Sequence, residues 1–299
     1  MTNPYSDPER EAFQVGGIDR DMSEEEQLEQ LASYIHAHYE APEKNPPWSD
    51  NPSDPLPADT FDAMLPDRLT HSSMLMLGAA VNHAMPGVAF IDGITVEDLP
   101  ELNAKIFRPS QPSGAWAISL HPGGWWKGSG VALENAWRPE VAGLAELSGV
   151  TIVDLDYPLL PESDLPAVIA AVTQAAEWIR SQGAPWVGAW GYSSGGALAV
   201  LCAELFDALA LTFPHLELDG LPEDIRGGTD FPALDTLPTT FMQIASHDSI
   251  AGHYPWFEEA SAVRTQVYTS EHRVSTPTVA RQRVRDIAEF FRSNYAHES

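Results

Sequence analysis

The sequence predicts an α/β fold in which helices cover both faces of a mostly parallel β-sheet. From about residue 115 onwards, short apolar runs alternate with longer helical patterns at the spacing of βαβ units. Parallel strands require such crossovers because the chain must return to the same end of the sheet before each new strand. The 299 residues, 43% of them hydrophobic, suffice for one large core of this kind.

Six apolar runs have the length of buried strands: 115–120, 151–155, 186–190, 208–213, 240–245 and 265–268. Helical patterns lie between or after them: 132–147, 165–181, 194–206, 255–262 and 277–294. Ahead of this alternation, residues 88–91 and 103–107 are short β-type runs around a polar turn. These two runs predict a hairpin.

The first 85 residues have a different pattern and are expected to be mostly helical. Residues 22–39 begin with several acidic side chains and then carry apolar residues at helical spacing. The proline-rich stretch 41–57 predicts an extended connection, and a second helical region follows from about Asp59. We therefore divide the chain into an N-terminal helical segment, residues 1–85, and a main α/β domain, residues 86–299.

The net charge and the lack of long apolar segments exclude several classes of partner. Sixteen Lys and Arg against 43 Asp and Glu give a net charge of −27, which repels phosphate backbones and anionic lipids. We therefore expect neither a nucleic acid nor a membrane as partner. The sequence starts without a signal-type segment, and no apolar run is long enough to span a bilayer, so we expect a cytoplasmic protein.

The composition also favours a protein without a metal or an organic cofactor. The single cysteine, Cys202, excludes an intramolecular disulfide and a cysteine-rich metal site. His36 and His38 are two positions apart, so on a helix they face different ways and do not form a ligand pair. No Walker-type phosphate loop and no dinucleotide glycine motif follows a strand.

The sequence Gly-Tyr-Ser-Ser-Gly at residues 191–195 lies between the apolar run 186–190 and a helical run. Its glycines permit the sharp strand-to-helix turn that lifts a nucleophilic serine above a sheet. We therefore expect Ser193 to be a nucleophile. Ser194 is the poorer candidate because Tyr192, and not a glycine, stands two positions before it.

A serine nucleophile needs a base within hydrogen-bond reach and a carboxylate that holds this base in the correct tautomer. Asp248 and His272 each directly follow one of the last two predicted strands, where loops leave the carboxyl edge of the sheet. We assign His272 as the base and Asp248 as the acid. The reserve candidates are His253 and Asp235. Three further alternatives end no strand as closely: His215, His247 and Asp230.

The tetrahedral intermediate of acyl transfer needs backbone N–H donors for its oxyanion. Residues 121–126 read His-Pro-Gly-Gly-Trp-Trp and follow the first strand of the alternation. We expect the N–H groups of Gly123, Gly124 and Ser194 to form this oxyanion hole. Three neighbouring aromatic residues are expected to line the substrate pocket and to favour a small or medium acyl group: Trp125, Trp126 and Tyr192.

Three segments resemble motifs of one family: His-Pro-Gly-Gly at 121–124, Asp-Tyr-Pro-Leu-Leu-Pro-Glu at 156–162, and Gly-Tyr-Ser-Ser-Gly-Gly at 191–196. They are similar to the His-Gly-Gly-Gly, Asp-Tyr-Arg-Leu-Ala-Pro-Glu and Gly-Asp-Ser-Ala-Gly-Gly motifs of the hormone-sensitive-lipase-like esterases. The resemblance runs from about Phe90 to the C-terminus. Ser193, Asp248 and His272 follow one another in the order that is typical of the α/β-hydrolase fold. Each motif departs from the family pattern at one or two positions, and Pro122, Pro158 and Tyr192 are among these departures.

The resemblance implies an α/β-hydrolase fold with an N-terminal helical cap, for which residues 1–85 have a suitable size. It implies a serine esterase that acts on a small-molecule ester without a cofactor, and it allows a homodimer. Residues 1–85 as a separate interaction arm remain an alternative. For the whole protein, the alternatives are a non-catalytic ligand-binding member, or a peptidase, lactonase, thioesterase or acyltransferase with the same residues.

Overall fold

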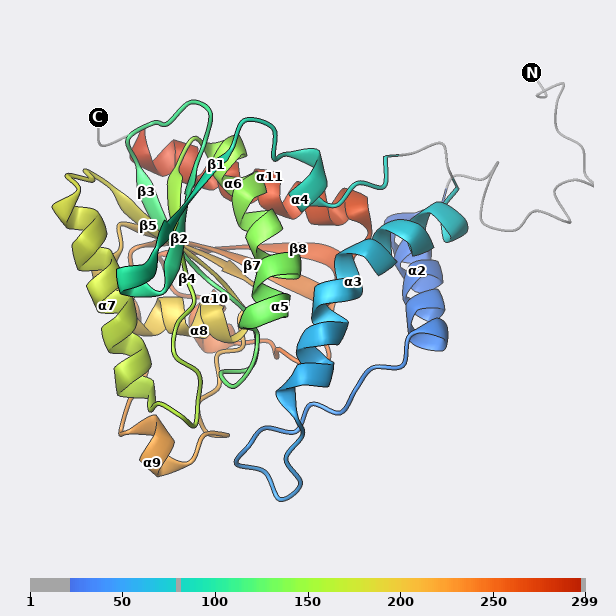
Figure 1. The fold of residues 1–299 in the computed structure, drawn as a ribbon, viewed down its shortest axis with the longest axis horizontal. Coiled ribbons are helices and arrows are strands. Elements are labelled where there is room, and N and C mark those ends of the chain that lie inside the picture. The colour runs from blue at the N-terminus through green and yellow to red at the C-terminus, as the bar shows by residue number, and fades with distance from the viewer. Residues whose placement is uncertain (1–21, 79–81, 297–299) are drawn as a thin grey trace, which may run out of the picture.

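The computed structural model describes residues 22–78 and 82–296, and within them an eight-stranded sheet lies between two layers of helices (Figure 1). The strands are β1 (Thr95–Leu99), β2 (Ala104–Arg108), β3 (Trp116–Leu120), β4 (Thr151–Leu155), β5 (Val187–Tyr192), β6 (Ala208–Thr212), β7 (Thr239–His247) and β8 (Val263–Glu271). Their order in the sheet is β1-β2-β4-β3-β5-β6-β7-β8. The β1–β2 and β2–β4 pairs are antiparallel and the other pairs are parallel, so the expected mostly parallel α/β sheet is confirmed.

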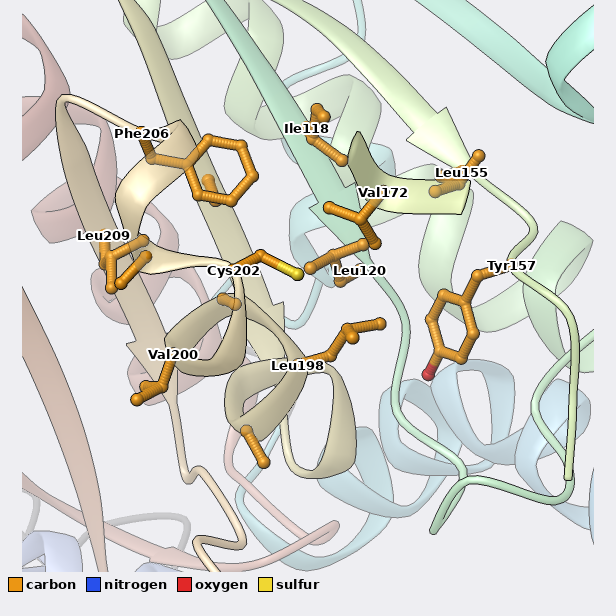
Figure 2. Close-up of a cluster of buried hydrophobic side chains, with 14 of the residues drawn as sticks. Ile118, Leu120, Leu155, Tyr157, Val172, Leu198, Val200, Cys202, Phe206 and Leu209 are labelled. Carbon is orange, nitrogen blue, oxygen red and sulfur yellow. The ribbon is translucent and has the colours of Figure 1, made fainter. Parts of the chain in front are cut away.

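The two helix layers have separate cores because alternate residues of each strand face opposite sides of the sheet. One layer contains α6 (Arg138–Ser148) and α11 (Pro277–Tyr295); the other contains α7 (Leu165–Ser181), α8 (Ser194–Leu201) and α10 (Pro255–Glu258). On β3, for example, Ala117 packs in the first core and Ile118 in the second. The second core holds Cys202 beside α8 (Figure 2), where burial raises the pKa of the thiol to about 12.

The expected hairpin is only half correct. Residues 103–107 do form β2, but its partner is β1, and residues 88–91 are not a strand. They overlap the short helix α4 (Pro86–Ala89), in which the N–H groups of Val88 and Ala89 donate to the carbonyl of Met85. Proline at the first helical position favours this turn. Strand β1 lacks an apolar pattern because four of its five residues are exposed at the sheet edge.

The N-terminal helices α2 (Glu24–His38) and α3 (Pro55–Met76) pack on each other beside β8 (Figure 1). The two helices contribute six buried side chains to one cluster: Leu28, Leu31, Ala32, Ile35, Leu65 and Leu69. Val274 and Ala280, which follow β8 in the chain, belong to the same cluster. Helix α2 starts with a capping box between Ser23 and Glu26. The second helix begins at Pro55, a few residues before the expected Asp59, because Asp54 caps it by accepting from the N–H of Leu56.

Short helical turns complete the described fold: α5 (Gly130–Ala132), α9 (Glu223–Arg226), the π-turn η2 (Leu133–Trp137), and the 3-10 turns η1 (Pro100–Leu102), η3 (Ala203–Leu205) and η4 (Leu234–Thr236). Within residues 22–78 and 82–296, no helix has both the length and the apolar character needed to cross a bilayer. Strands β5, β7 and β8 run parallel, so their carboxyl ends meet at one edge of the sheet. Ser193, Asp248 and His272 directly follow these ends.

Candidate active site

Ser193 occupies a sharp turn between β5 and α8. Its backbone has φ 56° and ψ −119°, a conformation that costs a non-glycine residue on the order of 1–3 kcal/mol. The turn is held by two hydrogen bonds, from the Ser193 N–H to the carbonyl of Thr212 and from the His215 N–H to the carbonyl of Ser193. A strained turn of this kind lifts the hydroxyl above the carboxyl edge of the sheet.

The flanking glycines are required by the space around the turn. A Cβ on Gly191 would lie 2.1 Å from the carbonyl oxygen of Gly195, and one on Gly195 would lie 2.1 Å from that of Leu120. Both distances are far below any van der Waals contact, so the backbone of β3, the turn and α8 must approach without side chains. The Gly-x-Ser-x-Gly spacing therefore has a local steric cause in this chain.

Ser193, His272 and Asp248 form one chain of hydrogen bonds. His272 Nε2 lies 3.0 Å from Ser193 Oγ, and His272 Nδ1 lies 2.8 Å from Asp248 Oδ2. The other carboxylate oxygen, Asp248 Oδ1, accepts from the N–H groups of Ile250 at 2.8 Å and Ala251 at 2.7 Å. Both carboxylate oxygens of the assigned acid therefore accept hydrogen bonds.

The charges of this chain suit a histidine that accepts a proton. Burial lowers the pKa of His272, and the hydrogen bond and charge of Asp248 offset this effect only in part, so the imidazole is neutral near pH 7. Burial would raise the pKa of Asp248, but the hydrogen bond and charge of His272 and the two backbone donors outweigh it and lower that pKa. The acid is therefore a carboxylate that holds the proton of His272 on Nδ1.

The reserve candidates lie in other surroundings. His253 is exposed and lies 3.6 Å from Glu258, and Asp235 is exposed on a surface turn. The remaining alternatives are also engaged elsewhere: His215 with Glu217, His247 with Glu25, and Asp230 with Arg226.

Tyr192 does more than line a pocket. Its hydroxyl donates a hydrogen bond to the backbone carbonyl of His272 and so ties the residue before Ser193 to His272. Burial raises the pKa of Tyr192, so the phenol keeps the proton that it donates. Its position beside Ser193 predicted a place for Tyr192 at the pocket, but nothing in the sequence pointed to this contact across 80 residues.

The glycine loop after β3 has a conformation that only glycine permits at two positions. Gly123 has φ 150° and a Cβ there would lie 1.7 Å from the carbonyl oxygen of Lys127; Gly128 has φ 105° and a Cβ there would lie 2.1 Å from that of Pro122. Gly124 has φ 62°, but a Cβ there would approach no atom more closely than 3.6 Å. The loop thus closes tightly on itself, and its Gly124 contacts Ser194, the residue after Ser193.

The three expected oxyanion donors are not equivalent in the structure. The N–H of Gly124 donates to Ser194 Oγ at 3.0 Å. The N–H of Ser194 is the first of helix α8, so it has no partner within the helix, and the N–H of Gly123 has no hydrogen-bond acceptor among the described residues. The hydroxyl of Ser194 therefore connects the glycine loop to the turn at Ser193.

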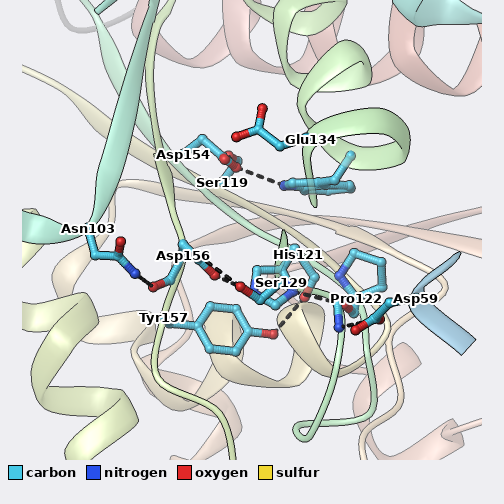
Figure 3. Close-up of polar contacts among 12 residues, drawn as sticks. Asp59, Asn103, Ser119, His121, Pro122, Ser129, Glu134, Asp154, Asp156 and Tyr157 are labelled. Carbon is cyan, nitrogen blue, oxygen red and sulfur yellow. Dashed lines mark hydrogen bonds and ion pairs between the residues drawn. The ribbon is translucent and has the colours of Figure 1, made fainter. Parts of the chain in front are cut away.

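The second motif, residues 156–162, holds the glycine loop in place (Figure 3). Tyr157 donates from its hydroxyl to the carbonyl of His121 at 2.7 Å, and its ring stacks on the His121 ring with centroids 4.1 Å apart. The N–H of Leu160 donates to the carbonyl of Trp125 at 3.0 Å. His121 is buried and hydrogen-bonded through Nδ1 to Pro122, and burial lowers its pKa to about 4, so it is a neutral structural residue.

Helix α3 reaches the same loop. Asp59 accepts a hydrogen bond from the N–H of Gly128 at 2.9 Å (Figure 3). One turn further along the helix, the buried carboxylate of Asp62 accepts from Lys127 Nζ at 2.8 Å and pairs with Arg273 beside the assigned base. Nothing in the sequence marked Asp59 and Asp62 as site residues because their partners lie 65 or more positions away.

The three aromatic residues expected at the pocket are separated in the structure. Trp125 is buried in the core of the α7 and α8 layer, and Trp126 is also buried. Neither residue lines the cavity that adjoins His272, whereas Tyr192 does. Trp125 has a φ of 77° directly after Gly124, and its side chain packs in that core.

Comparison with known proteins agrees with this architecture. Residues 117–216 match the model of a family described as having the alpha/beta hydrolase fold. This segment contains all three motifs and Ser193, although it covers only a third of the chain. No curated protein matches the chain in sequence.

Several solved structures share the fold. An esterase from the bacterial hormone-sensitive lipase family is 16% identical and has a TM-score of 0.61, with 91% of this chain and 99% of that chain covered. An esterase/lipase from an uncultured bacterium is 16% identical, with a TM-score of 0.60 and 90% and 99% covered. An esterase from Pyrobaculum calidifontis is 19% identical, with a TM-score of 0.55 and 79% and 90% covered.

The chain is thus an α/β hydrolase by fold, with an eight-stranded sheet and the family's sequence pattern around Ser193. Its architecture is similar to that of solved esterases, one of them from the bacterial hormone-sensitive lipase family. At identities below 20%, this likeness concerns the fold, and the chemistry must be argued from the site itself.

Proposed function

We propose that this protein is a serine esterase that hydrolyses carboxylic esters of small to medium acyl groups through an acyl-enzyme intermediate. The observation that carries the proposal is the hydrogen-bonded chain from Asp248 through His272 to Ser193, with contacts of 2.8 and 3.0 Å. Nucleophile, base and orienting acid stand within reach of one another, as acyl transfer by serine requires.

In the first half of the reaction, Ser193 Oγ attacks the ester carbonyl while His272 Nε2 accepts the hydroxyl proton. The lowered pKa of His272 keeps Nε2 unprotonated and ready to accept, and Asp248 stabilises the imidazolium that forms. His272 then gives the proton to the alcohol oxygen as the ester bond breaks. In the second half, a water molecule activated by His272 attacks the acyl-enzyme and releases the acid.

The oxyanion of each tetrahedral intermediate is stabilised by the N–H groups of Gly123 and Ser194. Each such donor contributes about 10²–10³-fold to turnover. Gly124, the third donor in this proposal, contributes when its N–H exchanges Ser194 Oγ for the oxyanion, since the two acceptors compete for one hydrogen.

The N-terminal segment, residues 1–85, acts as a cap over the substrate in this proposal. Support comes from α3, which supplies Asp62, Leu65, Pro66 and Leu69 to the cavity beside His272. The apolar wall continues with Met85, Trp137 and Phe213. A cavity walled by bulky side chains favours small and medium acyl groups.

The test is hydrolysis of p-nitrophenyl acetate, butyrate and octanoate at about pH 8 by the protein and its Ser193→Ala variant. The variant should lose about 10⁴-fold or more, and acetate and butyrate should be better substrates than octanoate. Ser293→Ala, on the exposed face of α11, is the matched control and should keep full activity. Equal activity in Ser193→Ala and wild type would overturn the assignment of the nucleophile.

A further inference from the structure

The cavity beside His272, here called the His272 cavity, has an apolar body and a charged end. It encloses about 90 Å³, whereas one water needs about 10–15 Å³ by the same measure, so it accommodates a group of several heavy atoms. Its apolar wall comes from α3, Met85, Trp137 and Phe213. Its charged and polar side chains are Asp62, Glu140, Tyr192, Ser270, His272, Arg273, Ser275 and Arg283.

The charged end holds buried hydrogen-bond donors without acceptors. Arg283 is only 3% exposed, and its Nε and Nη1 have no partner among the described residues. The same holds for Nε of Arg273 and for the hydroxyl of Ser275. Buried donors are almost always paired in folded proteins, so several orphans around one cavity indicate a missing acceptor.

The acids that line the cavity do not fill this role. Asp62 is saturated, because Arg273 and Lys44 lie at its Oδ1 and Lys127 at its Oδ2. This carboxylate therefore faces three cations. The nearby Asp59 accepts a hydrogen bond from the N–H of Gly128. Its carboxylate can balance at most one further positive charge of these cations.

Glu140 is a weak counter-ion for Arg283. Its Oε2 is buried and has no hydrogen-bond partner among the described residues, because it lies 3.7 Å from Arg283 Nη2, which is too long for a hydrogen bond. Burial raises the pKa of Glu140 by more than Arg283 lowers it, which reduces its negative charge further. The guanidinium carbon of Arg283 lies 5.2 Å from the centre of the Phe213 ring and 5.8 Å from that of Tyr192, so aromatic faces hold it in place.

Resting on the proposed ester hydrolysis, we propose that the His272 cavity binds a carboxylate of the substrate through Arg283, Arg273 and Ser275. The enzyme would then act on esters that carry a free carboxylate in their acid or their alcohol half. A carboxylate offers two acceptor oxygens, matches the planar donor pattern of arginine, and neutralises a local excess of positive charge. A neutral acyl chain in this cavity would leave the same donors without acceptors.

Two matched pairs of esters test the proposal. Monoethyl adipate and ethyl hexanoate differ in the acid half, and 4-acetoxybutyrate and butyl acetate differ in the alcohol half; each pair exchanges a terminal carboxylate for a methyl group. Hydrolysis is followed by acid release, and kcat/KM is compared for the wild type, Arg283→Met and Ser275→Ala. Arg285→Met, an exposed position on the same helix, is the control.

The wild type should prefer the anionic member of at least one pair by about tenfold or more, as one charge-assisted arginine contact allows. Arg283→Met should abolish the preference and Ser275→Ala should reduce it, with the preference read within each variant as the ratio of kcat/KM for the two members of a pair. Preference for the neutral ester in both pairs, or an unchanged preference in both variants, overturns the carboxylate site and leaves the esterase proposal intact.

A binding measurement separates the two proposals. Monoethyl adipate is titrated calorimetrically into Ser193→Ala and into the double variant Ser193→Ala, Arg283→Met, with thermal unfolding as the check on folding. Binding to the first protein that the second lacks supports the carboxylate site even if no ester is hydrolysed, and absence of binding to a folded Ser193→Ala protein overturns it. In the same Ser193→Ala background, Arg283→Lys keeps the charge but not the planar donors, so it should bind more weakly than the parent and more tightly than Arg283→Met.

Discussion

Replacement of Asp248 by asparagine changes the proton position on His272 and little else. Asp248 Oδ1 accepts from the N–H groups of Ile250 and Ala251, so the amide oxygen of an asparagine must occupy this position. Its NH₂ group then faces His272 Nδ1, which must accept and cannot carry the proton. The proton moves to Nε2, which lies 3.0 Å from Ser193 Oγ and can no longer act as a base.

The expected loss in kcat is about 10⁴-fold, the size that a wrong histidine tautomer causes in a serine triad. It corresponds to about 5.5 kcal/mol of transition-state stabilisation. KM should change little because Asp248 does not touch the substrate in the proposed mechanism.

The assay is p-nitrophenyl butyrate hydrolysis by Asp248→Asn and Asp235→Asn, with thermal unfolding as the measure of folding. Asp235, the reserve acid, is exposed, so its variant should keep wild-type activity. If Asp248→Asn retained more than about a tenth of the wild-type kcat, the argument from the tautomer would be refuted. If Asp235→Asn lost activity instead, the acid would be misassigned.

Three further changes test other parts of the site. Gly123→Ala should reduce kcat by about 10²-fold or more, since its Cβ would lie 1.7 Å from a carbonyl oxygen. Gly124→Ala, with φ 62° and no atom closer than 3.6 Å to its Cβ, should stay within about tenfold. Kinetics with p-nitrophenyl butyrate compare the two variants, and equal losses would contradict the steric argument. In a pH profile, kcat/KM should fall as the pH is lowered and His272 becomes protonated. The midpoint should lie below the ordinary histidine pKa of 6.5 because burial lowers the pKa of His272, and a midpoint above about 7 would contradict this explanation. Asp62→Asn leaves Lys127, Lys44 and Arg273 without their carboxylate, so it should lower the free energy of unfolding by about 3–5 kcal/mol in urea titrations. Asp67→Asn, an exposed position on the same helix, is the control and should change that free energy by less than about 0.5 kcal/mol.

The regular part of the fold followed from local pattern. Helix α7 begins and ends at the residues expected from its apolar periodicity, and β4 likewise, because a buried face leaves a clear trace in the sequence. The expected strand at residues 88–91 was wrong for a related reason. Four apolar residues cannot by themselves separate a strand from a helical turn that packs on α6, and the true edge strand β1 is polar.

The candidate nucleophile could be named from sequence because its requirements are local. Gly191 and Gly195 surround Ser193 within five residues, and a steric conflict at either glycine would prevent the turn. Asp248 and His272 could be named because parallel strands bring their carboxyl ends to one edge, so position after a strand substitutes for a distance. Their hydrogen-bond distances still depended on the folded chain.

The sequence by itself determined the fold class, the strand-end positions of three polar residues and the glycines of two turns, since each of these depends on neighbours within a few positions. Only the tertiary structure decided that Trp125 belongs to the core, that Tyr192 holds the carbonyl of His272, and that Ser194 engages Gly124. It also decided that Arg273 and Arg283 meet at one cavity with Asp62. Contacts across tens of residues depend on how helices and loops pack, and no periodicity along the chain encodes which side chains then meet.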